Sequence, residues 1–248
     1  MGLKSTLPVL LLLLVTSLIY PGSRSGQSNQ HSRSPKIPFE SSIQQVYESL
    51  NDSSLNPEAF QIAMLGYRSL TSQGLVLKDG LLTIIDYSLP SSDDRFYVID
   101  LQLKNIVYKT LVAHGRNSGE LYANRFSNNS QSHQSALGFY ITGCPYEGGQ
   151  GYSMLLNGVD TGYNDHARVR SIVMHGAVYA TRDFINRYGR LGRSFGCPAL
   201  PPDKNGAIIN LIKDGSVLFS FYPDQTYLNR SKVLGYFPQE SMTTSSNL

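Results

Sequence analysis

A succession of short runs rich in Ile, Val, Tyr, Phe and Thr, beginning at Leu81, is the feature that most constrains the fold of this chain. β-Branched and aromatic side chains pack well on a pleated sheet, and polar residues or Pro separate the runs as turn residues do. This pattern predicts a series of strands. They are expected at residues 81–87, 96–101, 106–113, 137–142, 154–156, 171–175 and 217–222.

Helical spacing of apolar residues occurs before the first strand and again between the later ones. Two short helices are expected within 40–72, where Asn56 and Pro57 form a typical N-cap and first-turn pair. Two further helices are expected at 181–189 and 203–213. Together with the strands, they indicate a mainly β protein with a few helices, of the α+β class.

The composition agrees with a β-rich globular protein and excludes several other classes. The 248 residues include 16 Tyr and 10 Phe, and only 16% are charged, which argues against a disordered chain or a coiled coil. Two cysteines are too few for a disulfide framework or a four-cysteine zinc site. A net charge of +3 is too small for the dense basic face that binds nucleic acid, so no nucleic-acid partner is expected.

The N-terminus has the pattern of an export signal. Lys4 precedes an apolar run over 7–20, and small and polar residues follow up to Gly26. A basic start, a short apolar core and a small-residue exit are typical of a secretory signal peptide, whereas a membrane span needs ~20 apolar residues. We predict a cleaved signal peptide at 1–25 and a mature protein in the periplasm or cell envelope without stable membrane insertion. An uncleaved anchor is the alternative.

The rest of the chain divides into four parts by composition. A tether rich in Ser, Gln and Asn is expected at 26–39, a helical segment at 40–75, a β-rich domain at 76–225 and a polar tail at 226–248. Within the domain, the polar stretch 115–134 predicts a long loop. Loops of that length are uncommon unless they are functional or disordered.

Cys144 and Cys197 are the first candidates for chemistry. Exported proteins seldom keep free cysteines, so either the two form a disulfide or one of them has a function. Cys197 follows a glycine-rich turn, and a predicted strand ends at His175. A cysteine nucleophile needs a base, usually histidine, and backbone N–H donors for the oxyanion, which a glycine such as Gly196 leaves accessible. A buried inert thiol and a structural histidine would account for these residues equally well.

The residues around this pair form a motif, in which His175-Gly176 is followed by Ser194-x-Gly196-Cys197. It resembles the signature of the L,D-transpeptidase family, also called YkuD-like, and more narrowly the murein L,D-transpeptidase catalytic-domain branch. The resemblance covers about residues 40–225. The blocks that carry it are 111–119, 135–142, 162–165, 172–177 and 189–199.

The resemblance implies an L,D-transpeptidase β-sandwich catalytic domain at 76–225, preceded by the short helical segment. Cys197 would attack the carbonyl of a peptidoglycan stem peptide, and His175 would accept its proton. The carbonyl of Gly176 would orient the imidazole, and the N–H groups of Gly196 and Cys197 would hold the oxyanion. Substrate contacts are predicted for Ser194, which would also shape the loop, and for Tyr140, Arg193 and His114; a structural position fits His114 equally well.

Two departures from the better-known members concern the loop around the nucleophile. Phe195 stands where they have a second histidine, and Pro198-Ala199 stands where they have an aliphatic residue and an arginine. The first departure removes a side chain that would help to hold the oxyanion. The second removes a contact to a substrate carboxylate, for which Arg190 or Arg193 is a candidate replacement.

The resemblance therefore implies an exported L,D-transpeptidase that forms a thioester on Cys197, requires no cofactor and has peptidoglycan stem peptides as its partner. No histidine shows metal-ligand spacing with a cysteine or an acid, so no metal site is predicted. Two alternatives stay open. One is an L,D-carboxypeptidase or endopeptidase with water as the acceptor, and the other is a non-catalytic wall-binding module.

Overall fold

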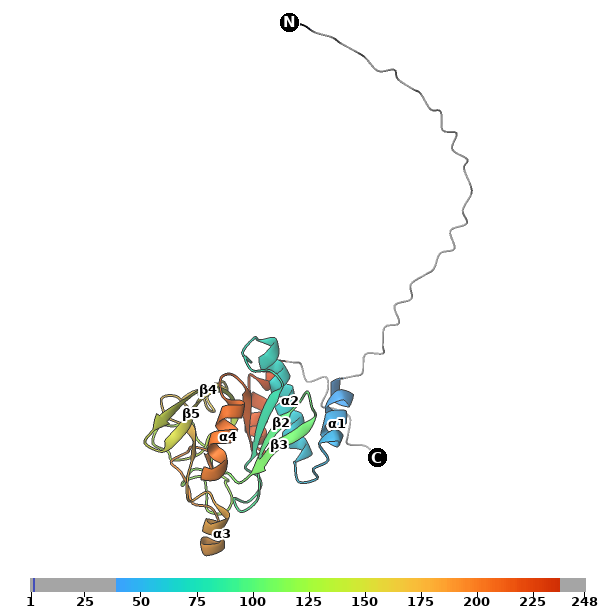
Figure 1. The fold of residues 1–248 in the computed structure, drawn as a ribbon. Coiled ribbons are helices and arrows are strands. Elements are labelled where there is room, and N and C mark those ends of the chain that lie inside the picture. The colour runs from blue at the N-terminus through green and yellow to red at the C-terminus, as the bar shows by residue number, and fades with distance from the viewer. Residues whose placement is uncertain (1, 3–38, 237–248) are drawn as a thin grey trace, which may run out of the picture. The chain divides into compact units, whose positions relative to one another are not determined.

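The computed structural model describes Gly2 and residues 39–236 (Figure 1). Apart from Gly2, the predicted signal peptide lies outside the described residues, as do nearly all of the predicted tether and the end of the predicted tail. No helix within 39–236 is long and apolar enough to cross a membrane. The elements are α1 (Phe39–Leu50), α2 (Pro57–Ser72), β1 (Leu81–Asp86), β2 (Phe96–Asp100), β3 (Asn105–Thr110), β4 (Gly138–Gly148), β5 (Gly151–Gly158), β6 (Val173–Gly176), α3 (Arg182–Tyr188), β7 (Ala199–Leu200), α4 (Pro202–Ile212), β8 (Val217–Phe221), α5 (Gln225–Arg230) and the 3-10 helix η1 (Leu234–Tyr236).

The strands of the described chain form one hydrogen-bonded sheet of eight, in the order β3-β2-β1-β8-β4-β5-β6-β7. β1 runs parallel to β8 and β6 runs parallel to β7, whereas the other neighbours are antiparallel. The predicted class, mainly β with a few helices and a helical segment in front, is confirmed. The resemblance implies a sandwich of two sheets. In the described residues, all eight strands are hydrogen-bonded into one continuous sheet.

The β5–β6–β7 edge of the sheet positions the residues of the predicted site. β6 is four residues long and pairs His175 with Ser153 of β5. On the other side of β6, the parallel strand β7 pairs Ala199 with His175. Because Cys197 lies two residues before Ala199, this pairing brings the cysteine alongside the strand that carries the histidine.

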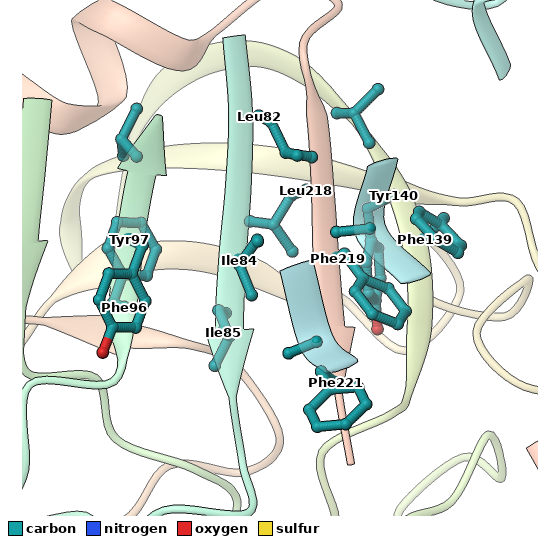
Figure 2. Close-up of a cluster of buried hydrophobic side chains, with 14 of the residues drawn as sticks. Leu82, Ile84, Ile85, Phe96, Tyr97, Phe139, Tyr140, Leu218, Phe219 and Phe221 are labelled. Atoms are coloured by element: carbon teal, nitrogen blue, oxygen red, sulfur yellow. The ribbon is translucent and has the colours of Figure 1, made fainter. Parts of the chain in front are cut away.

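Large apolar side chains fill the centre of the sheet (Figure 2). Phe139 of β4 and Phe219 of β8 stack with their ring centroids 4.2 Å apart, and both are fully buried. Helix α2 packs against β1 and β8, and α4 packs against β4, β5 and β6. Gly66 of α2 faces the ring of Phe139, where a Cβ atom would collide with it. The absence of a side chain at Gly66 therefore sets how closely α2 approaches the sheet.

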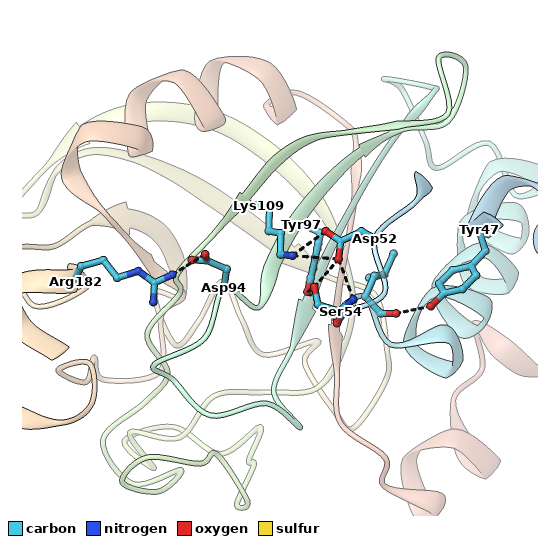
Figure 3. Close-up of polar contacts among 8 residues, drawn as sticks. Tyr47, Asp52, Ser54, Asp94, Tyr97, Lys109 and Arg182 are labelled. Atoms are coloured by element: carbon cyan, nitrogen blue, oxygen red, sulfur yellow. Dashed lines mark hydrogen bonds and ion pairs between the residues drawn. The ribbon is translucent and has the colours of Figure 1, made fainter. Parts of the chain in front are cut away.

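Polar contacts fasten the helical segment to the sheet (Figure 3). Nζ of Lys109 in β3 lies 2.8 Å from the carboxylate of Asp52, which follows α1. The hydroxyl of Tyr97 in β2 lies 3.1 Å from that of Ser54. The predicted helical segment 40–75 thus belongs to the same compact unit as the strands.

The polar tail expected from residue 226 begins later than predicted. Helix α5 starts after Asp224, whose side chain accepts hydrogen bonds from two backbone N–H groups of the first turn. Tyr227 of this helix is fully buried, and its hydroxyl lies 3.0 Å from the carboxylate of buried Asp160. The folded unit therefore includes α5 and η1, because Tyr227 is buried and the partly buried Leu228 and Leu234 pack against the same core.

The predicted long loop at 115–134 contains neither a helix nor a strand. Hydrogen bonds within the loop backbone stabilise its conformation. The carbonyl of Ser118 accepts hydrogen bonds from the N–H groups of Asn124 and Arg125. Gly115 forms an isolated bridge with Ser194, so the loop begins next to the predicted nucleophile loop.

Candidate active site

His175 and Cys197 line the same cleft, which has a volume of about 390 Å³. The hairpin between β4 and β5 contributes Tyr146 and Gln150 to its lining, and the loop before β7 contributes Arg193 and Phe195. The fold therefore brings together the two side chains that the motif predicts as base and nucleophile.

The backbone at the start of β6 holds the sulfur of Cys197. The N–H of Val173 donates to Sγ at 3.4 Å, and Sγ donates to the carbonyl oxygen of Ser171 at 3.6 Å. Ser171 adopts a left-handed conformation with φ of 55°, which is uncommon for a residue other than glycine. This turn explains why β6 begins at Val173 and not at residue 171 as predicted. One short segment thus supplies both hydrogen-bond partners of the thiol and, two residues later, His175.

The imidazole of His175 is buried, with only 4% of the residue exposed. Its Nδ1 atom lies 3.0 Å from the carbonyl oxygen of Gly176. A carbonyl can only accept, so Nδ1 carries the hydrogen and Nε2 carries the lone pair. Burial lowers the pKa of His175, and the hydrogen bond to Gly176 raises it in part. The ring is therefore a neutral base near pH 7.

The thiol of Cys197 is neutral in the same environment. Burial raises its pKa above the ordinary value of 9.0, while the N–H of Val173 and the positive charge of Arg170 lower it. Among the described residues, the thiol hydrogen bonds to Ser171 and not to His175. The resting pair consequently consists of a thiol and an imidazole, with no charge on either.

The loop that carries Cys197 is closed by the hydroxyl of Ser194. This hydroxyl donates to the carbonyl of Cys197 at 2.6 Å and accepts from the N–H of Gly196 at 3.0 Å. Gly196 has φ of 121°, and a Cβ atom there would lie 2.7 Å from the carbonyl oxygen of Gln134. The N–H of Gly196, predicted to hold the oxyanion, is therefore already bonded to Ser194. Within the described chain, the N–H of Cys197 donates no hydrogen bond.

Arg193 lines the cleft, but its charge is paired. One nitrogen lies 2.6 Å from Oε1 of Glu120, and a nitrogen of Arg190 lies 2.9 Å from Oε2 of the same carboxylate. Glu120 itself is exposed, with 68% of its side chain accessible to solvent. Both arginines that were candidates for a substrate carboxylate thus share one acid from the 115–134 loop.

His114 and Tyr140 lie in the interior, which corrects the prediction that they contact substrate. His114 is fully buried, and its Nδ1 and Nε2 atoms lie 2.7 Å from a nitrogen of Arg95 and 3.3 Å from the carbonyl of Gly119. Burial and the charge of Arg95 lower the pKa of His114 to about 3. Tyr140 is 2% exposed, and its hydroxyl donates to the carbonyl of Ala136. Neither side chain therefore lines the cleft.

Phe195, which replaces the second histidine of better-known members, is 64% exposed at the edge of the cleft. Its ring centroid lies 4.5 Å from that of His133, and the guanidinium carbon of Arg116 lies 5.7 Å from it. Both neighbours come from the long polar loop. The sequence carries no periodicity that would predict these contacts.

The two cysteines are free thiols, so the alternative of a disulfide is wrong. Cys144 is exposed on β4 and does not line the cleft. Within the part of the chain that the structure describes, no group of three or more His, Cys, Asp or Glu side chains could hold a metal ion.

Comparisons with known proteins identify the family. Residues 51–221 match the sequence profile described as the L,D-transpeptidase catalytic domain. No curated protein matches the chain. Among solved structures, the chain is similar to an L,D-transpeptidase from Mycobacterium smegmatis (13% identity, 58% of this chain and 59% of that chain, TM-score 0.35) and to one from Mycobacterium tuberculosis H37Rv (12%, 58% and 58%, 0.38). It is also similar to one from Stackebrandtia nassauensis (11% identity, 73% and 76%, TM-score 0.38).

The structural likenesses are distant, and the chain spans about 59% of the first of these relatives. The sequence profile, in contrast, covers more than half of the chain and includes every residue of the motif. The chain therefore belongs to the family of L,D-transpeptidase catalytic domains.

Proposed function

We propose that this protein is an exported L,D-transpeptidase that acts on peptidoglycan stem peptides through a thioester on Cys197, with His175 as the base. The observation that carries the proposal is the shared cleft of the two residues. The hydrogen bond from Nδ1 of His175 to Gly176 leaves Nε2 as the proton acceptor, and among the described residues Nε2 has no partner. Cys144, the other thiol, lies outside the cleft.

In the first half-reaction, the thiol turns from Ser171 toward His175, and Nε2 takes its proton. Sγ then attacks the carbonyl carbon of the donor stem, and the N–H of Cys197 donates to the resulting oxyanion. Collapse of this intermediate breaks the peptide bond between the L- and D-centres, and His175 returns the proton to the leaving amine. The product is a thioester between Cys197 and the donor stem.

In the second half-reaction, an amine of a neighbouring stem attacks the thioester. His175 removes a proton from this amine, and the thiol is regenerated when the new amide forms. Arg193 lines the cleft and is the candidate contact for a carboxylate of the substrate, because Glu120 compensates only one of the charges of Arg193 and Arg190. If water replaces the amine, the same steps give an L,D-carboxypeptidase or endopeptidase.

Incubation of the purified protein with muropeptides, followed by mass spectrometry of the products, tests this proposal. We expect cross-linked products from the wild type and from Cys144→Ser, the matched control, and none from Cys197→Ala. Products of hydrolysis alone would favour the peptidase. Turnover that survives Cys197→Ala would overturn the assignment of the nucleophile, and muropeptides left unchanged by the wild type would favour a wall-binding module.

The export part of the proposal rests on the N-terminal pattern of Lys4, the apolar run at 7–20 and the small residues that follow. Intact-mass measurement of protein recovered from the cell envelope tests it separately. We expect a mature chain that lacks residues 1–25. A full-length chain held in the membrane fraction would instead support an uncleaved anchor.

A further inference from the structure

Arg170 holds a partly buried positive charge beside the nucleophile loop. Its guanidinium donates to the carbonyl of Ser127 at 2.5 Å, to the carbonyl of Gln134 at 2.6 Å and to the hydroxyl of Ser132 at 3.2 Å. All three acceptors are neutral. No carboxylate among the described residues pairs with this arginine.

Two features place this charge close to Cys197. A nitrogen of Arg170 lies 3.2 Å from the position that a Cβ atom of Gly196 would occupy, directly before the nucleophile in sequence. Arg170 is also followed by Ser171, whose carbonyl accepts the hydrogen of the thiol. The guanidinium therefore lies beside the backbone of Gly196, and the backbone that follows Arg170 holds the thiol.

The other charges around the cleft do not perform this role. Arg193 and Arg190 share the carboxylate of Glu120, whose single negative charge compensates one of the two positive charges, and both side chains are held toward this exposed acid. The remaining titratable groups that influence the thiol or line its cleft are His175, Tyr87, Tyr146 and Tyr179. A tyrosine side chain carries no positive charge, and burial keeps His175 neutral near pH 7. Arg170 is consequently the cation beside the thiol that has no carboxylate partner within the described chain.

We propose that Arg170 is a positioning residue that clamps the 127–134 segment against the nucleophile loop and stabilises the Cys197 thiolate by its uncompensated charge. The inference rests on the proposed function, because it assumes that the thiolate is the reacting species. Burial raises the pKa of the thiol, and Arg170 acts in the opposite direction together with the N–H of Val173. A planar guanidinium is suited to this position, since it donates to three acceptors at once.

The experiment measures the pKa of the Cys197 thiol from its rate of alkylation by iodoacetamide as a function of pH, in a Cys144→Ser background. A charge of this kind changes a neighbouring pKa by about one unit, so we expect Arg170→Gln to raise the thiol pKa by about that amount. Alkylation near pH 7 should then slow by about tenfold. Arg170→Lys keeps the charge and should recover most of the rate. Arg168→Gln, an exposed arginine of the same segment, is the matched control and should match the parent protein.

Thermal unfolding of each variant separates this role from a merely structural one. A folded Arg170→Gln variant with an unchanged thiol pKa would overturn the proposal. If Arg170→Gln does not fold, the test uses Arg170→Lys. A thiol pKa in Arg170→Lys close to that of the parent protein supports stabilisation of the thiolate by the positive charge, and a thiol pKa raised by a full unit contradicts it. Because alkylation needs no peptidoglycan, a pKa shift together with inactivity of the wild type on muropeptides would remove the proposed function and leave the electrostatic role intact.

Discussion

The Nδ1 atom of His175 lies 3.0 Å from the carbonyl oxygen of Gly176, the next residue along β6. This contact fixes the tautomer of a buried ring without any acidic side chain, because the backbone carbonyl takes the place that a carboxylate occupies in other triads. The donor and the acceptor belong to adjacent residues, so this hydrogen bond does not depend on distant parts of the fold. The environment of the ring, by contrast, comes from the sheet around it, and this environment sets its pKa.

The first prediction concerns the acid side of the pH profile of kcat/KM. Burial lowers the pKa of His175 below its ordinary value of 6.5, so the neutral base persists into more acidic solution than a free imidazole would. We expect the acid limb to fall below pH 6.5. His175→Ala should lose about 100-fold or more in kcat, whereas His166→Ala, an exposed histidine outside the cleft, should keep the profile. An acid limb above pH 6.5 would show that burial does not control this group.

The second prediction concerns the hydroxyl of Ser194. Its removal in Ser194→Ala leaves the N–H of Gly196 and the carbonyl of Cys197 without their partner. A lost buried hydrogen bond costs about 1–3 kcal/mol, and the loosened loop should lower kcat by about tenfold or more. The comparison is Ser72→Ala in α2, whose hydroxyl bonds to the carbonyl of Ser69 and whose loss should leave kcat unchanged. Equal kcat for the two variants would show that Ser194 does not organise the loop.

The third prediction concerns the two ways in which a methyl group at residue 196 would destabilise the protein, through the backbone conformation and through a steric collision. In Gly196→Ala, the new methyl group would lie 2.7 Å from the carbonyl oxygen of Gln134, and φ of 121° is strained for alanine. We expect a loss of more than about 2 kcal/mol in the free energy of unfolding and a loss of turnover. Gly189→Ala has φ of 72° but meets no atom within 4 Å, so it should cost only about 1–2 kcal/mol and keep full turnover. Urea denaturation and initial rates of both variants provide the measurement.

The sequence motif predicts that His175 and Cys197 belong to one site, and the two side chains line the same cleft. His175 ends a strand and Cys197 follows a glycine-rich turn, and both features are visible as local patterns. The mainly β class was also predictable, because strands carry a compositional signal over several residues. The sequence could not show that the N–H of Gly196 is used by Ser194, since this depends on how the turn closes.

Residues that depend on distant parts of the chain escaped prediction. His114 lies in a block that resembles the family, yet its burial against Arg95 is decided by tertiary packing. Arg170 contacts the long polar loop, and Glu120 belongs to it. The sequence of this loop has no periodicity from which these contacts could be predicted. The helix that carries Tyr227 was missed for a related reason. Tyr227 and the adjacent Leu228 anchor it, and two neighbouring apolar residues in a six-residue stretch do not form the spacing that predicts a helix.

The fourth prediction concerns stability at acidic pH. Burial and Arg95 lower the pKa of His114 to about 3 in the folded protein, against about 6.5 in the unfolded chain. Between these values the unfolded chain binds more protons, so the contribution is complete above pH 6.5 and is lost as the pH falls toward 3. We expect the wild type to lose about 2 kcal/mol from this group between pH 7 and pH 5.

His114→Gln removes this titration and should flatten the pH dependence of the free energy of unfolding by the same amount. Buried Asp86 and Asp160 have raised pKa values and act in the opposite direction, but they are present in both proteins. The difference between the two urea-denaturation series therefore isolates His114. Parallel series would mean that the folded protein protonates this ring as easily as the unfolded chain does.

The fifth prediction tests how closely α2 approaches the sheet. In Gly66→Ala, the added methyl group collides with the buried ring of Phe139, and overpacking of a core costs about 1–3 kcal/mol. Gly206→Ala in α4 is the matched control, because no atom lies within 4 Å of the added methyl group. It should gain about 0.5–1 kcal/mol from the better helix propensity of alanine.

The two helical glycines are thus expected to respond with opposite sign to the same chemical change. A double variant shows whether the collision is the cause: in a Phe139→Leu background, the cost of Gly66→Ala should shrink, because the ring atoms that meet the methyl group are gone. The coupling energy between the two positions, obtained from urea denaturation of the four proteins, should be about 1 kcal/mol or more. A stabilising Gly66→Ala would show that α2 can move away from the sheet without loss. Additive effects of the two substitutions would show that the ring of Phe139 is not the cause of the cost at Gly66.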